Sequence, residues 1–198
     1  MRRIGMTGTI ASGKTSAAIL LKRHGYTVFN SDQYAKLALH AGNPCFARLI
    51  EVLGREVAAD NGDIDPKKMA ARIFSDEQAR LQVNAIVHPY VREGMEKFFQ
   101  ARKEEPFAFA EVPLLFEAHM EDAFDEICVI TCDKDIAVKR MMEDREYTEE
   151  EALNRYNSQI DPQIQIEKAD KVIYNNGTLS ELNSEVNRWL RELKERTR

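Results

Sequence analysis

The sequence predicts an α/β fold in which a five-stranded parallel sheet is flanked by helices, with a helical domain and a lid inserted between the strands. Two observations carry this prediction. Five short apolar runs of strand length alternate with patterns of helical period. A glycine-rich motif stands directly between the first run and the first helical pattern, in the order that phosphate-binding loops require.

The predicted strands are mostly continuous apolar runs, as expected for strands that helices cover on both faces. They span Arg3–Thr7, Thr27–Asn30, Phe107–Val112, Glu126–Thr131 and Lys171–Tyr174. A helix over Lys14–Arg23 follows the first strand and ends before Gly25. A last helix carries an apolar stripe, and Thr178 with Glu181 forms a capping box at its start.

Two stretches interrupt the alternation of strand and helix. Residues 35–104 read as helix throughout, which is too long for one crossover and predicts a helical subdomain. Residues 139–167 are charged, with a capping box at Thr148 and Glu151, and with Arg155 and Gln159 placed one turn apart on one helix face. We expect this segment to move as a lid. The predicted organisation is a core of residues 1–34, 105–138 and 168–198, a helical subdomain of residues 35–104, and a lid of residues 139–167.

Composition excludes several classes of protein. The 198 residues carry a formal charge of −5, so the chain lacks the positive field of a non-specific nucleic-acid binder. No apolar run approaches the roughly 18 residues that a membrane span requires, and no export signal follows the first arginines. Cys45, Cys128 and Cys132 are odd in number and suit reduced, buried thiols. We expect a cytoplasmic protein, monomeric or weakly homo-oligomeric.

The motif Gly8-Thr9-Ile10-Ala11-Ser12-Gly13-Lys14-Thr15 carries the strongest chemical signal. It matches the phosphate-binding P-loop, in which backbone N–H groups and a helix N-terminus surround phosphate oxygens. An ordinary glycine-rich turn is the alternative, and the strand-to-helix context argues against it. Lys14 is expected to reach the β and γ oxygens, and Thr15 to ligate Mg²⁺.

Two acids follow predicted strands at the sheet edge where ligands bind in such folds. Asp32, after the second strand, can accept the proton of an attacking hydroxyl, or it can be the N-cap of the next helix. Glu111, at the end of the third strand, can hold Mg²⁺ through water, or it can be a plain surface carboxylate. The sequence leaves both choices open.

Basic residues gather in the predicted lid at Lys139, Arg140, Arg145 and Arg155. A charged helix face is usually only solvated, but arginines beside a P-loop favour a clamp on the transferring phosphoryl group. His88, before Pro89, reads as a helix-ending histidine with a satisfied hydrogen bond more than as a catalytic one.

Taken in order, these motifs resemble the dephospho-coenzyme A kinase family over nearly the whole chain. The resemblance rests on IGMTGTIASGKT at the P-loop, on NSD ending in Asp32, on IVHPYV, on PLLFE at Pro113–Glu117, and on the lid arginines. Ala169-Asp170 and the Asn175-Asn176-Gly177 turn complete it. The family usually has glycine at Thr9 and aspartate at Asn30, so Asn30 receives no proton-transfer role. The family's lysine upstream of Ala169 has no clear counterpart.

The resemblance implies a P-loop kinase fold and transfer of phosphate from ATP, with Mg²⁺, to the ribose 3′-hydroxyl of dephospho-CoA. Asp32, Lys14 and Arg140 would be catalytic. The nucleotide would be held by Gly8, Thr9, Ile10, Ala11, Ser12, Gly13, Lys14, Thr15, Ser16, Arg145, Asn175 and Asn176, and the metal by Thr15. The acceptor would be held by Thr7, Asp32, His88, Leu115, Arg140 and Arg155. A kinase of another small acceptor, such as a nucleoside monophosphate, and a P-loop switch protein remain as alternatives.

Overall fold

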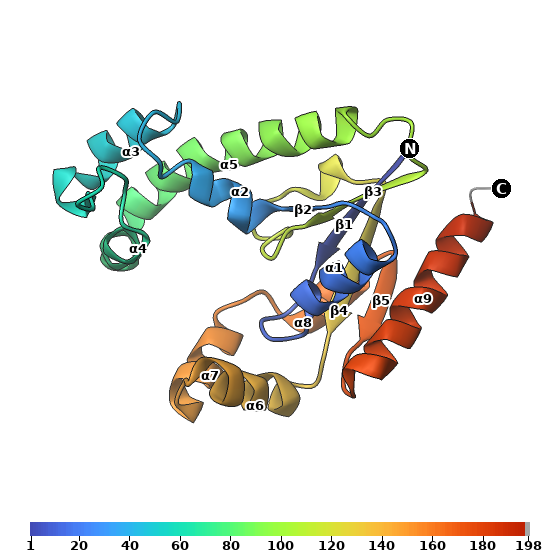
Figure 1. The fold of residues 1–198 in the computed structure, drawn as a ribbon. Helices are drawn as coiled ribbons and strands as arrows, with labels where there is room; N and C mark the ends of the chain where they lie inside the picture. The colour runs from blue at the N-terminus through green and yellow to red at the C-terminus, as the bar shows by residue number, and fades with distance from the viewer. Residues whose placement is uncertain (197–198) are drawn as a thin grey trace. The chain divides into compact units, whose positions relative to one another are not determined.

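The structure, a computed structural model that describes residues 1–196, contains a five-stranded sheet in the order β2-β3-β1-β4-β5 (Figure 1). The strands are β1 (Arg2–Thr7), β2 (Val28–Asn30), β3 (Phe107–Glu111), β4 (Glu126–Thr131) and β5 (Lys171–Tyr174). The first strand pairs in parallel with β3 on one side and β4 on the other. The predicted parallel α/β sheet is therefore confirmed, and each predicted strand is correct to within one residue.

The described part of the chain contains nine α-helices, eight between the strands and one after the last strand. They are α1 (Lys14–Arg23), α2 (Ser31–Leu37), α3 (Phe46–Leu53), α4 (Pro66–Ser75), α5 (Glu77–Gln100), α6 (Lys134–Arg145), α7 (Glu149–Asn157), α8 (Pro162–Glu167) and α9 (Leu179–Glu195). Short 3₁₀ turns lie at Arg55–Val57 and Glu121–Ala123. Among residues 1–196, no helix combines the length and apolar character needed to cross a membrane.

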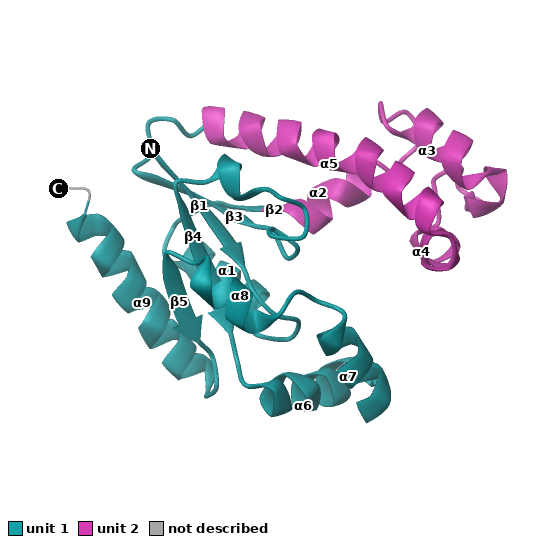
Figure 2. Cartoon of the chain, turned by 180° about the vertical axis from the view of Figure 1, so that it is seen from behind, with its two compact units in different colours: residues 1–29, 102–198 teal, residues 30–101 magenta. Residues whose placement is uncertain are grey.

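The chain divides into two compact units, residues 1–29 with 102–198 and residues 30–101 (Figure 2). In the first unit, α1 and α9 pack together and share one apolar core with the sheet. Trp189 of α9 is fully buried there, with its ring edge-on to Phe109 at 5.6 Å. This core fixes β1 and α1, and therefore fixes the loop that joins them.

The second unit is built along α5, which packs against α2, α3 and α4. Its core includes Leu49, Leu53, Ile64, Val83 and Ile86. The structure corrects the expectation that a helix ends at His88, because Pro89 lies inside α5. Proline removes one N–H from the helix ladder, yet packing on three neighbouring helices holds the helix together through that point.

The segment predicted as a lid folds as α6, α7 and α8 within the first unit. The capping box at Thr148 and Glu151 is present at the start of α7, as predicted. The prediction that Arg155 and Gln159 share a helix face is wrong, since α7 ends at Asn157 and Gln159 follows its C-cap. The chain cannot continue as helix because Pro162 disfavours helical geometry at the residue before it and starts α8 instead.

Candidate active site

The P-loop joins the end of β1 to the start of α1 in the first unit. Gly8 has φ +142°, and a Cβ there would overlap the carbonyl oxygen of Ile130 in β4. Gly13 has φ +97°, and a Cβ there would overlap the side-chain amide nitrogen of Asn175. Glycine is thus required at both positions by backbone conformation and by space, which accounts for the motif's spacing.

Positive charge is concentrated where the P-loop enters α1. The Nζ of Lys14 donates hydrogen bonds to the carbonyl oxygens of Gly8 (2.8 Å) and Thr9 (2.7 Å), which hold the ammonium group against the loop. The first turn of α1 contains no acidic residue, so nothing in that turn offsets the positive end of the helix dipole. An ammonium group and a helix N-terminus together favour phosphate oxygens.

Residues from distant parts of the first unit hold the tip of the loop. The side-chain amide of Asn175, which is buried, donates to the Ser12 carbonyl at 2.8 Å. Arg140 of α6 donates to the carbonyl oxygens of Asn175 (2.9 Å) and Ala11 (3.4 Å). Asn176 accepts a hydrogen bond from the backbone N–H of Asp133. Both asparagine side chains therefore shape the ends of the loop and of β4.

Thr15 and Glu111 form the part of the site that suits a divalent cation. The Thr15 hydroxyl donates to the Glu111 carboxylate at 2.8 Å. Glu111 is only 3% exposed, so the alternative of a plain surface carboxylate is wrong. A hydroxyl and a carboxylate beside a phosphate-binding loop are the hard oxygen donors that Mg²⁺ takes, with the remaining positions left to water and phosphate. The residues present fit the ion.

Asp32 lies in the first turn of α2, in the second unit, and its side chain is exposed. The residue that caps α2 is Asn30, whose side-chain oxygen accepts from the backbone N–H of Gln33 at 2.8 Å. The alternative that Asp32 is the N-cap is therefore wrong. His88 of α5 belongs to the same unit, and partial burial lowers its pKa, which favours a neutral imidazole near pH 7.

The remaining predicted lid arginines differ in their surroundings. Arg145, at the end of α6, is exposed. Arg155 of α7 is also exposed, and its guanidinium lies over the Tyr147 ring, 4.5 Å from the centroid. Tyr147 is not part of the P-loop, and a clamp formed by these arginines stays a prediction.

Three further predicted residues lie in the first unit. Thr7, at the end of β1, is buried and donates from its hydroxyl to the Pro113 carbonyl at 3.2 Å. Ser16 follows Thr15 in the first turn of α1. Leu115 is fully buried, and its side chain lies so close to Gly5 that a Cβ there would be crowded. Its neighbour Leu114 is 52% exposed, and the assignment of Leu115 to the acceptor site stays a prediction.

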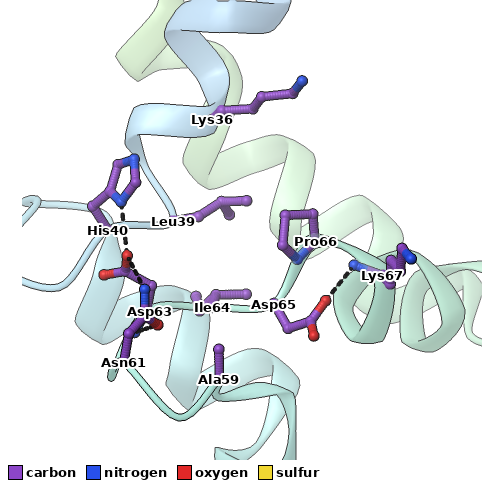
Figure 3. A pocket seen from close by; sticks show the side chains of 10 residues that line it. All are labelled: Lys36, Leu39, His40, Ala59, Asn61, Asp63, Ile64, Asp65, Pro66 and Lys67. Carbon is purple, nitrogen blue, oxygen red and sulfur yellow. Dashed lines mark hydrogen bonds and ion pairs between the residues drawn. The ribbon is translucent and has the colours of Figure 1, made fainter.

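The second unit contains a cavity of about 580 Å³ (Figure 3). The residues that line this cavity were not predicted as site residues from the sequence. Leu39, Ile64 and Pro66 contribute apolar surface, and Lys36 and Lys67 contribute positive charge. At one side His40 Nδ1 lies 2.9 Å from Asp63, whose pKa is lowered by hydrogen bonds from the Ala41 N–H and from His40. The volume lies in the range of small-molecule sites.

A family model, a curated relative and two solved structures are similar to this chain. A family model described as dephospho-CoA kinase matches residues 2–181. The chain is 35% identical over 189 residues to the dephospho-CoA kinase of Bacillus licheniformis, with 94% of each chain covered. A solved protein of Thermus thermophilus is similar with a TM-score of 0.82 and 31% identity, over 97% of both chains. The dephospho-CoA kinase of Campylobacter jejuni has a TM-score of 0.75 at 23% identity, covering 99% of this chain and 98% of that one, which shows a shared fold.

Proposed function

The chain belongs to the dephospho-CoA kinase family, so it transfers a phosphoryl group from a nucleotide to dephospho-CoA, and we propose that the donor is ATP and the accepting atom is the ribose 3′-oxygen. In this reaction the 3′-oxygen forms a bond to the γ-phosphorus, and the bond from that phosphorus to the departing ADP oxygen breaks. The hydroxyl proton leaves with a base. The observation that carries the proposal is the P-loop together with the Thr15–Glu111 pair.

Phosphate binding falls to the P-loop and Lys14. The backbone N–H groups at the start of α1 point toward the helix N-terminal end, where phosphate oxygens are favoured. The ammonium group of Lys14, which bonds to the Gly8 and Thr9 carbonyls of the loop, would contact the β- and γ-phosphate oxygens when the nucleotide is bound. Both interactions gain strength as negative charge builds on the γ-phosphoryl group.

Thr15 and Glu111 would hold Mg²⁺, with Glu111 acting directly or through a coordinated water. The ion, when bound, neutralises charge on the β- and γ-phosphate oxygens. Because Glu111 is buried, water competes little for its hydrogen bond to Thr15, which keeps the two oxygen donors together.

Asp32 would orient the 3′-hydroxyl and accept its proton. Its side chain is exposed, it is not engaged as a helix cap, and it follows the strand next to β3 in the sheet. A carboxylate at the end of a strand in this kind of sheet is near the edge where ligands bind. The guanidinium groups of Arg140, Arg145 and Arg155 would then neutralise the phosphoryl group in transfer after the segment of residues 139–167 closes.

The helical unit would bind the rest of the acceptor. Its cavity combines apolar surface from Leu39 and Ile64 with the ammonium groups of Lys36 and Lys67. The Asp63 and Asp65 carboxylates in the same lining accept hydrogen bonds from the backbone N–H groups of Ala41 and Lys67. This mixture suits a molecule that has both a flexible amide-rich arm and phosphate groups. We expect Lys36→Ala to raise the KM for dephospho-CoA several-fold and to leave the KM for ATP unchanged. Lys103→Ala, an exposed lysine outside the cavity, is the matched control. Equal effects of the two substitutions would contradict the assignment.

An acceptor panel tests the proposal as a whole. The purified chain is incubated with ATP, Mg²⁺ and either dephospho-CoA, a nucleoside monophosphate or no acceptor, and ADP formation and phosphorylated products are measured. Rapid ADP formation with dephospho-CoA alone supports the proposal. Phosphorylation of the nucleoside monophosphate would identify a different kinase, and slow hydrolysis that no acceptor changes would identify a nucleotide-dependent switch.

A further inference from the structure

The connection between α7 and α8 makes a direct hydrogen bond to the P-loop. The side-chain oxygen of Gln159 accepts from the backbone N–H of Ile10, the third residue of the motif, at 2.7 Å. The two residues are 149 positions apart. A bond this short between a backbone N–H and a neutral amide oxygen is well formed, and it fixes the orientation of the peptide plane between Thr9 and Ile10.

That orientation matters because the next residue is strained. Ala11 has φ +57°, in the left-handed region that a residue with a Cβ rarely adopts. Such a conformation persists only where the surroundings hold it in place. Arg140 donates to the Ala11 carbonyl, and Gln159 accepts from the N–H of Ile10, so both ends of the Ile10–Ala11 segment are held.

Apolar contacts join the same two segments. Ile10 and Ala11 pack against a cluster formed by Val138, Met141 and Ala152 of α6 and α7. Gln159 lies in the connection between α7 and α8, and hydrogen bonds hold the end of this connection next to α8. The Ile160 N–H donates to the Glu117 carboxylate, and Asp161 caps α8. The glutamine is thus held in a defined place instead of sampling solvent, as a residue that positions a site must be.

We propose that Gln159 is a positioning residue of the nucleotide site, which holds the Ile10–Ala11 segment of the P-loop in the conformation that receives the ATP phosphates. It does not touch the reacting atoms. Its effect is on nucleotide affinity, since the loop of a variant must be ordered again each time ATP binds. The proposal rests on the P-loop binding ATP, as proposed above.

Gln159→Met tests this, because methionine keeps the length of the side chain and removes the acceptor oxygen. We expect the amide of Ile10, followed by NMR hydrogen exchange without nucleotide, to exchange at least about tenfold faster than in the parent protein. The dissociation constant of a non-hydrolysable ATP analogue with Mg²⁺ should rise about three- to tenfold, as expected for one lost hydrogen bond. The value of kcat and the KM for dephospho-CoA should change by less than about twofold.

Gln163→Met is the matched control, since Gln163 lies four residues further along and its side chain bonds to Glu167 within α8. It should alter neither the exchange of Ile10 nor the affinity for the analogue. An unchanged Ile10 amide or an unchanged analogue affinity in Gln159→Met would overturn the proposal, as would an equal loss in the control. The amides of β4 report whether each variant is folded.

Gln159→Glu separates the acceptor oxygen from the rest of the side chain. Glutamate retains an acceptor for the Ile10 N–H, so that amide should stay protected, and faster exchange in this variant would also overturn the proposal. The added charge near phosphate makes its ATP affinity uninformative, so only exchange is compared. If the parent protein failed to phosphorylate dephospho-CoA, the proposed function would fail, while exchange and analogue binding would still test Gln159.

Discussion

Replacing Asp32 with asparagine removes the proposed acceptor-side base and keeps the size of the side chain. The structure allows the effect on folding to be separated from the effect on turnover. The N-cap bond of α2 runs from the Gln33 N–H to Asn30 and does not involve Asp32. The substitution removes one negative charge from the first turn of a helix, which costs about 0.3 to 1 kcal/mol of stability at an exposed position.

The expected loss of turnover is much larger. A positioned general base contributes about 10² to 10⁴ in rate, which corresponds to about 2.7 to 5.5 kcal/mol of transition-state stabilisation. Because phosphoryl transfer has a loose transition state, proton removal comes late, and orientation of the hydroxyl supplies much of this effect. Either role lowers kcat and leaves the binding of ATP in the other unit unchanged.

The assay measures kcat with dephospho-CoA, the affinity for an ATP analogue, and urea unfolding of the same preparation. Asn30→Ala is the control, since loss of the cap should cost about 1 kcal/mol of stability with much less loss of turnover per folded molecule. If Asp32→Asn kept turnover within about tenfold of the parent protein, the assignment of Asp32 as the base would be refuted.

Three further predictions follow from the geometry. Lys14→Ala removes a charged phosphate contact and should weaken binding of the ATP analogue by about 1.5 to 3 kcal/mol, measured by calorimetry; unchanged affinity would contradict the P-loop assignment. Hydrogen exchange over residues 139–167 should slow when ATP analogue and acceptor are added together, and equal exchange would count against a closing lid. Hydrogen bonds from Thr178 lower the pKa of Glu181, so its stabilising effect is present above the unfolded pKa, near 4.5, and is lost as pH falls through the folded value. Glu181→Gln, which preserves the capping box, should therefore reduce the loss of stability as pH falls below about 4.5, and an unchanged pH dependence of thermal unfolding would contradict this.

The features that the sequence predicted well have local causes. The strands are continuous apolar runs bounded by polar residues, and the capping boxes at Thr148 and Thr178 depend on residues three positions apart. The P-loop combines a strand end, a glycine with positive φ and a helix start within a few residues. In each case the physical constraint and the sequence signal occupy the same short stretch.

The errors arose where tertiary packing overrides local preference. Pro89 reads as a helix end, yet packing on three helices carries α5 through it. The helical spacing of Arg155 and Gln159 fails because the chain leaves the helix at Ser158. The bond from Gln159 to Ile10 has no local signal, because it joins segments 149 residues apart.

The hydrogen bond from Asn175 to Ser12 has a consequence for the order in which the protein is made. Residues 8–15 leave the ribosome long before residue 175 is added, and at 5 to 20 residues per second the delay is on the order of ten seconds or more. During that time the nascent chain contains the whole glycine-rich motif but lacks the amide that holds Ser12, and until residue 131 is added it also lacks a complete pair of partner strands for β1. Nucleotide therefore cannot assist the early steps of folding, and ribosome-bound chains that stop before Asn175 should not be retained on immobilised ATP.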